Sequence, residues 1–255
     1  MFWKRKSKPA PPVRDSFTIP EGRRVYAIGD IHGRDDLFAA LMELIRADNV
    51  ARGPAEVTVV LLGDLVDRGP QSAEVVERAI RLKDEFPDTR LLIGNHEECF
   101  LAALTGDVRR LRYFMRIGGE ATVRSYWKDE ESFVEASFED IAEQLPGKVP
   151  AEHVQFLGSG DDVVEIGDYI FVHAGIRPGV PIEKQSLGDL RWIREEFLDD
   201  DRDHGAIIVH GHTICDNVDE WPNRIGIDTG AYKSGVLTAI ALEGRDRRYL
   251  KTNGE

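Results

Sequence analysis

The chain has 255 residues, of which 42% are hydrophobic and 31% charged, and its formal net charge is −13. This composition is that of an ordinary globular protein, and the length suits one α/β domain with a sizeable core. The acidic balance argues against general nucleic-acid binding, and no stretch approaches the ~20 apolar residues of a membrane-spanning helix. Cys99 and Cys215 make no secreted disulfide framework, so we expect two thiols in a reducing compartment and a cytoplasmic protein.

Residues 1–20 are predicted to form a flexible tail that is basic at first and then rich in proline. No apolar segment follows the basic stretch, so the pattern is not that of a signal peptide. Phe2 and Trp3 stand beside four cations, which leaves weak membrane or partner contact open as an alternative to a solvated tail. A single domain is expected to cover residues 21–250.

Three apolar runs near the start of this domain read as buried strands, and each ends in a short polar motif. The runs are residues 25–28, 57–62 and 91–93, and the motifs are GDIHG at 29–33, GDLVDRG at 63–69 and GNHE at 94–97. In open α/β sheets, ligand sites lie at the carboxyl ends of strands. The three motifs are therefore candidates for one shared site.

Helical spacing of apolar residues at 35–48 and 72–86, after the first strands, predicts β-α-β units. Residues 98–157 are also helix-like and hold no expected ligand, so they predict a helical insertion over or beside the site, with a turn near the site at residues 117–120. Later strands are predicted at residues 163–166, 169–172, 206–209, 224–227 and 236–242. These suit a second sheet, and so a two-sheet sandwich flanked by helices.

The motif residues are those that a pair of divalent metals needs for chemistry at phosphorus. Two metals ~3.5–4 Å apart require a bridging carboxylate, neutral imidazoles and oxygen donors. Asp30, His32, Asp64 and Asn95 supply these groups, and the motifs contain no cysteine for a thiolate zinc site. A turn, or a helix capped by Asn95, explains one motif taken alone. Three motifs in order, each after a strand-like run, favour the metal pair.

Taken together, the motifs resemble those of the phosphoprotein phosphatase family within the calcineurin-like metallophosphoesterases. The resemblance continues to HAG at 173–175 and GHT at 211–213, so it extends from about residue 25 to about residue 242. It is nearest to small bacterial and phage-type serine/threonine phosphatases, with diadenosine tetraphosphate hydrolases as near relatives. It implies an α/β fold, the αββα sandwich of two mixed β-sheets flanked by helices, with a helical insertion.

The resemblance also implies a role for each matching residue. The implied metal ligands are Asp30 and His32 for the first ion, Asp64 as the bridge, and Asn95, His173 and His212 for the second ion. His210 stays open as the alternative to His212, because the chain reads VHGH at 209–212.

The remaining implied roles concern the substrate. His96 would be the general acid and Asp67 would orient it, as a carboxylate orients an imidazole. Arg68 and Arg194 would hold phosphate oxygens, with Arg194 fitting the expected position better than Arg191. Tyr232 would line the phosphate pocket.

These features predict a metal-dependent phosphatase for phosphoserine and phosphothreonine that works by direct attack of a metal-bound hydroxide. No Cys-x5-Arg loop surrounds either cysteine, which supports direct hydrolysis. The alternatives are a dinucleoside polyphosphate hydrolase and an inactive binding module, which the complete ligand set disfavours. We expect two divalent ions, first of all Mn(II), although Fe, Zn and Co suit the same ligands. The expected partner is a phosphorylated protein or small phosphoester, and the oligomeric state stays open.

Overall fold

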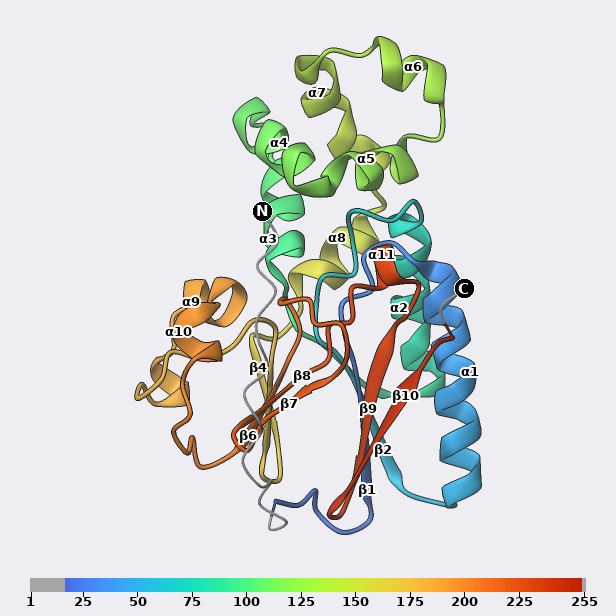
Figure 1. Cartoon of the computed structure of the whole chain (residues 1–255). Coiled ribbons are helices and arrows are strands. Elements are labelled where there is room, and N and C mark those ends of the chain that lie inside the picture. Colours follow the sequence, from blue (N-terminus) through green and yellow to red (C-terminus); the bar gives the residue numbers. More distant parts are fainter. Residues whose placement is uncertain (1–16, 254–255) are drawn as a thin grey trace.

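The computed structural model describes residues 17–253, and its strands form two five-stranded mixed sheets (Figure 1). The first sheet has the order β10-β9-β1-β2-β3, and the second has the order β4-β5-β6-β8-β7. The strands of the first sheet are β1 (Arg23–Ile28), β2 (Glu56–Leu61), β3 (Asp88–Leu91), β9 (Thr238–Glu243) and β10 (Asp246–Lys251). Those of the second sheet are β4 (Val163–Ile166), β5 (Tyr169–Val172), β6 (Ile207–His210), β7 (Asp219–Glu220) and β8 (Arg224–Gly226).

The helices fall into three groups along the chain. The first group is α1 (Asp35–Arg52) and α2 (Ser72–Glu85). The second group, which we call the helical region, is α3 (Asn95–Ala103), α4 (Val108–Phe114), the π-helical turn η1 (Met115–Gly119), α5 (Glu120–Trp127), α6 (Glu130–Glu135), α7 (Phe138–Lys148) and α8 (Ala151–Gly158). The third group is η2 (Ile182–Lys184), α9 (Leu187–Trp192), α10 (Glu195–Leu198) and α11 (Ala231–Ser234).

Parallel pairing brings the three motifs to one edge of the first sheet. β2 reads EVTVVL, and its last four residues are buried, as is typical of a strand covered on both faces. β1 pairs in parallel with β2, and β2 pairs in parallel with β3. The carboxyl ends of these strands therefore lie side by side, and a motif follows each of them.

Three apolar clusters divide the molecule into layers. One cluster lies between the sheets and joins Val60 of the first sheet to Phe171 and Val209 of the second. The outer face of the first sheet packs against α1 and α2, and that of the second packs against α9 and α10. Figure 1 accordingly shows these helices on opposite sides of the paired sheets. The predicted sandwich of two mixed sheets flanked by helices is confirmed.

The segment predicted as a helical insertion is helical, and α4 to α7 form a lobe beyond the ends of the strands (Figure 1). Its aromatic side chains Phe100, Phe114 and Tyr126 are buried in the same cluster as α1 and α2. The turn expected at residues 117–120 corresponds to η1, where Gly118 has a φ of 119°.

One prediction about the strands was wrong, and two strands were not predicted. Residues 236–242 were expected in the second sheet, but β9 pairs with β1, and β10 extends the first sheet further. An apolar run predicts a strand without saying which strand lies beside it, so the pattern could not decide the sheet. β7 and β10 were not predicted because neither is an apolar run, and β10 reads DRRYLK.

The termini and the cysteines bear on three further expectations. Residues 1–16, with Phe2 and Trp3, lie outside the described residues, so their role stays a prediction. Phe17 and Ile19, inside the range assigned to the tail, are buried between the sheets. Cys99 is a buried free thiol and Cys215 a half-buried one, as expected. None of the helices in residues 17–253 is both long and apolar enough to cross a membrane.

Candidate metal centre

The motif loops carry most of the strained backbone in the described part of the chain. Six described residues other than glycine have a positive φ, and five of them are His32, Asp64, Asp67, Arg68 and His212. Such a conformation costs about 1–3 kcal/mol for each residue and persists only where the surrounding structure holds it in place. Its concentration in the loops after β1, β2 and β6 points to a functional site.

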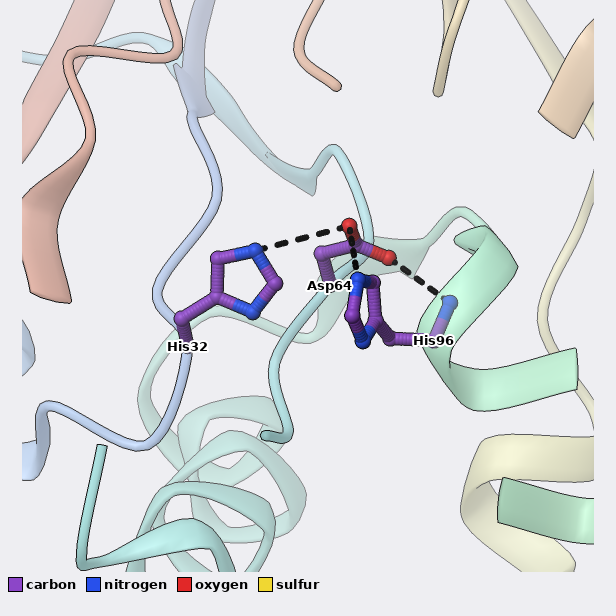
Figure 2. A group of neighbouring side chains, drawn as sticks. All are labelled: His32, Asp64 and His96. Atoms are coloured by element: carbon purple, nitrogen blue, oxygen red, sulfur yellow. Dashed lines mark hydrogen bonds and ion pairs between the residues drawn. The ribbon is translucent and has the colours of Figure 1, made fainter. Parts of the chain in front are cut away.

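Asp64 belongs to two groups of buried side chains that could each hold a metal ion. One group joins Asp64 to His32 and His96, and the other joins it to His173 and His212. Figure 2 shows the first group, in which His32 comes from the loop after β1, Asp64 from the loop after β2, and His96 from the start of α3. A carboxylate shared by two adjacent sites is what a pair of metals requires of a bridging ligand.

In the first group, a backbone contact fixes the orientation of His32. Its Nδ1–H donates to the carbonyl oxygen of Val66 at 2.8 Å, which leaves the lone pair on Nε2. Nε2 is buried without a hydrogen-bond partner and lies 3.6 Å from Oδ2 of Asp64. A buried lone pair beside a carboxylate is suited to a cation.

In the second group, the two imidazoles converge on Asp64 and on the side-chain oxygen of Asn95. His173 donates its Nδ1–H to the carbonyl oxygen of Leu62 at 2.8 Å. Its Nε2 then faces Oδ1 of Asn95 at 3.0 Å and Oδ1 of Asp64 at 3.5 Å. Nδ1 of His212 lies 2.8 Å from the same Asn95 oxygen. The Asn95 oxygen thus faces two ring nitrogens, an arrangement that suits either a proton on one ring or a cation among them. Gly94, not Asn95, is the helix N-cap, and a metal role for Asn95 stays a proposal.

Asp30 is in neither group of possible ligands. Its carboxylate accepts hydrogen bonds from the backbone N–H of His212 at 3.0 and 3.2 Å. The structure thus brings His32, Asp64, His173 and His212 together directly and places Asp30 beside them through the backbone of His212. A metal role for Asp30 stays a proposal.

The electrostatics of these groups suit divalent cations. Burial raises the pKa of Asp30, and the nearby carboxylates of Asp228 and Asp64 raise it further. Burial also raises the pKa of Asp64. Burial lowers the pKa of His173 to about 4 and also lowers that of His212, so both rings are neutral and keep their lone pairs. Neutral imidazoles, carboxylates and an amide oxygen are ligands for divalent metals, so the residues present fit two such ions.

His96 lies between a carboxylate and a guanidinium. Its Nδ1 is 2.5 Å from Oδ2 of the fully buried Asp67, and its Nε2 is 3.1 Å from Nη2 of Arg68 and 3.9 Å from Oδ2 of Asp64. Burial lowers the pKa of His96. The carboxylate of Asp64 raises this pKa, and the guanidinium of Arg68 lowers it. Arg68 donates to Nε2, so this nitrogen carries the lone pair, and the nearby cation opposes a metal and an added proton there alike. The contact of Nδ1 with Asp67 is typical of an imidazole that transfers protons, and this role for His96 stays a proposal.

The predicted phosphate-binding residues differ in their partners. Nε of Arg191 donates to Asp162 at 2.7 Å. Arg194 is exposed, and within residues 17–253 its guanidinium has no hydrogen-bond or ion-pair partner. Burial is the main cause of the lowered pKa of His173 and His212, and the positive charge of Arg194 is a further cause. Arg194 therefore lies near the centre. This arrangement favours Arg194 over Arg191.

Tyr232 and His210 are the two remaining candidates. The Tyr232 ring lies edge-on to that of His32, with 5.6 Å between centroids, and the guanidinium carbon of Arg68 is 4.8 Å from its centroid. Tyr232 therefore lies at the site. His210 is in neither ligand group, and its Nδ1–H donates to the carbonyl oxygen of Gly211 at 3.1 Å. The geometry favours His212 as the ligand.

The structure adds two buried carboxylates that the sequence left without a role. Glu97 accepts hydrogen bonds from the N–H groups of Asp64 at 2.7 Å and Gly94 at 2.9 Å, which ties two motif loops together. Its position three residues after the helix N-cap is a sequence signal for such a contact. Asp228 accepts from the N–H of Gly230 at 2.9 Å, and its other oxygen is buried without a hydrogen-bond partner. It follows a predicted strand, as the other motif residues do.

Comparison with known proteins identifies the chain as a phosphoesterase. The calcineurin-like phosphoesterase model matches residues 23–233. A symmetrical bis(5'-nucleosyl)-tetraphosphatase of Acidovorax ebreus is 34% identical over 68% of this chain and 47% of its own length. An asymmetrical bis(5'-nucleosyl)-tetraphosphatase of Anoxybacillus flavithermus is 26% identical over 84% of this chain and 88% of its own length.

Among solved structures, one provisionally described as a diadenosine tetraphosphatase covers 91% of this chain and 95% of its own, with a TM-score of 0.60 and 23% identity. At this identity the likeness shows the fold alone. The chain belongs to the calcineurin-like phosphoesterase family. It spans about half the length of the Acidovorax ebreus relative that it matches. The expected likeness to protein phosphatases is thus only partly confirmed, because both of these relatives are tetraphosphatases.

Proposed function

We propose that this phosphoesterase hydrolyses dinucleoside polyphosphates, cleaving a phosphoric anhydride bond with water at the centre around Asp64. The observation that carries the hydrolytic part is the pair of buried ligand groups that share this carboxylate. The substrate class rests on the tetraphosphatases of Acidovorax ebreus and Anoxybacillus flavithermus. This choice reverses the order of the two substrate classes that the motifs alone suggested.

The proposed ligands are those that the sequence implied: Asp30, His32 and Asp64 for one ion, and Asp64, Asn95, His173 and His212 for the other. When bound, two divalent ions supply positive charge to the phosphate oxygens and lower the pKa of water. Mn(II) is our expected metal, and Fe, Zn and Co suit the same mixed nitrogen and oxygen ligands.

The side chains around this centre bind the substrate and move a proton. Arg68 and Arg194 hold phosphate oxygens, since a guanidinium offers two parallel donors to such a group. The net charge of the chain is −13, so an anionic substrate is drawn by these local cations rather than by the whole molecule. Arg68 donates to Nε2 of His96 in this structure, so His96 takes up a proton from water at Nε2 when Arg68 turns to the phosphate. It then gives this proton to the leaving oxygen, while Asp67 keeps the ring oriented through Nδ1.

The His96–Asp67 pair favours a second candidate, the phosphoserine and phosphothreonine phosphatase. Cleavage of an anhydride releases a phosphate group, which is a weak base and needs little help from an acid. Cleavage of a phosphoserine releases an alkoxide, which is a strong base and gains most from general acid catalysis. A buried contact of 2.5 Å between imidazole and carboxylate is the kind of arrangement that the second reaction requires.

The preference between two substrates distinguishes the two candidate functions. We would load the purified chain with Mn(II) and measure kcat/KM for diadenosine tetraphosphate and for a phosphoserine peptide, with Asp64→Asn as the control for contaminating activity. The proposal expects the higher kcat/KM with the nucleotide, and chromatography of the products shows which anhydride bond is cut. The opposite preference supports the phosphatase. Turnover of neither substrate above the control, with metals bound, contradicts both.

A further inference from the structure

Helix α5 of the helical region places a buried hydroxyl directly behind Asp67. The Thr122 side chain is fully buried and meets Asp67 at two points. Its Oγ1–H donates to Oδ1 of Asp67 at 2.6 Å, and its oxygen accepts the backbone N–H of Asp67 at 2.8 Å. These are contacts between residues 55 positions apart in the sequence.

Ser72, the first residue of α2, completes this arrangement. Its Oγ lies 2.9 Å from Oγ1 of Thr122 and accepts the backbone N–H of Asp67 at 3.1 Å. A hydroxyl has one donor and two lone pairs. Because the proton of Thr122 is given to Asp67, the hydroxyl proton of Ser72 points to Thr122. Every hydrogen-bonding group behind Asp67 is therefore paired.

This pairing decides which carboxylate oxygen faces His96. Oδ1 of Asp67 is held by Thr122, and Oδ2 is thereby left to accept Nδ1–H of His96 at 2.5 Å. Asp67 also has a φ of 76°, a conformation that its surroundings must hold in place. Thr122 bonds both the backbone and the side chain of this strained residue, so it fixes the orientation of the carboxylate and, through it, of the imidazole.

We propose that Thr122 is a positioning residue for proton transfer by His96, acting through the carboxylate of Asp67. The inference rests on the proposed hydrolysis with His96 as acid, but not on the choice of nucleotide or protein as substrate. It also gives α5 a part in the chemistry, whereas the proposed ligand and acid of the helical region, Asn95 and His96, both lie at the start of α3.

The test uses Thr122→Val, which removes the hydroxyl and keeps the shape, and Thr122→Ser, which restores it. Thr58→Val is the matched control. Thr58 is also buried, and its hydroxyl donates to Asp88 over 2.7 Å, but neither residue belongs to the centre. Each Mn(II)-loaded protein is assayed for kcat and KM with an alkyl phosphate and with p-nitrophenyl phosphate, and its metal content is measured. These monoesters keep the test separate from the choice of natural substrate.

For Thr122→Val, kcat with the alkyl phosphate should fall by about tenfold or more, whereas kcat with the aryl phosphate should change little, because only the alkoxide depends strongly on an acid. KM and metal content should stay unchanged, Thr122→Ser should recover most of the loss, and Thr58→Val should show no selective effect. Equal losses with both substrates, loss of metal, no loss at all, or failure of serine to recover activity would each overturn the proposal.

Proton NMR supplies a second measurement that needs no turnover. The Nδ1 proton of His96 should give a low-field signal, identified by its absence in His96→Asn. This signal should weaken or vanish in Thr122→Val and return in Thr122→Ser. An unchanged signal in Thr122→Val means that Asp67 is held without the hydroxyl, and the inference then fails even if the substrate proposal is correct.

Discussion

The two sides of Asp64 are held in different ways. On one side, His173 and His212 follow strands of the second sheet, and His173 is oriented by the backbone of Leu62 at 2.8 Å. On the other side, the groups around His96 depend on the helical region. Thr122 bonds Asp67 there, and the carbonyl oxygen of Gly118 accepts the N–H of Arg68 at 3.0 Å. The side of His173 and His212, which we call the ligand side, is thus placed by strands of the second sheet. The side of His96 and Asp67, which we call the acid side, also needs a segment that lies outside the motifs.

The largest expected effect comes from the residue that both sides share. Asp64→Asn removes the negative charge that a bridging position needs, so both metals and nearly all activity should be lost together. Metal analysis and turnover of p-nitrophenyl phosphate measure this. Asp88→Asn, a change of the same kind away from the centre, is the control. An Asp64→Asn protein that keeps two metals and near-normal turnover would show that the ligand groups are assigned wrongly.

The next effect separates the acid side from the ligand side. His96→Asn should lower kcat for an alkyl phosphate by about 10²–10⁴-fold, with a much smaller loss for an aryl phosphate, while both metals stay bound. Asp67→Asn should give the same pattern more mildly, because it acts through His96. A ligand role for His96 predicts metal loss and equal damage to both substrates instead. Metal content and the ratio of the two rates decide between these roles.

The difference between the two sides also explains what the sequence could predict. Asp64, His173 and His212 each follow an apolar run, and the resemblance of the surrounding motifs to a known family singled them out as candidates. Thr122 lies in a helix 55 residues from its partner, and nothing in the local pattern marks it. Long-range pairing limited the prediction of the fold in the same way, since β9 was recognised as a strand but placed in the wrong sheet.

A smaller effect tests the choice between two arginines at the edge of the centre. Arg194→Ala should raise KM by about tenfold, as expected for losing a charge-assisted hydrogen bond to phosphate. Arg191→Ala should leave KM nearly unchanged, because Arg191 is paired with Asp162. Loss of the Arg191–Asp162 ion pair should instead lower the free energy of unfolding by up to about 1 kcal/mol, the usual range for a partly exposed pair. Equal KM values for the two variants would remove the reason for choosing Arg194.

The smallest effect examines the contact between the helical region and Arg68. Gly118 has a φ of 119°, and a Cβ there would lie 2.9 Å from Cγ of Arg68. Gly118→Ala should therefore be strained and should push Arg68 from its place, which raises KM for phosphate esters a few-fold while both metals stay bound. KM and metal content, measured on the same preparation, test this expectation.

Gly147→Ala is the matched control for that variant. Gly147 lies within α7, and a Cβ there would meet no heavy atom within 4 Å beyond its own stretch of helix, so an alanine side chain enters open space. Because alanine is favoured over glycine inside a helix by about 0.5–1 kcal/mol, this change should leave KM unaltered and raise the melting temperature slightly. If Gly118→Ala also leaves KM unaltered, Arg68 does not depend on the helical region. The difference between the two sides of Asp64 would then be confined to the contact of Thr122 with Asp67.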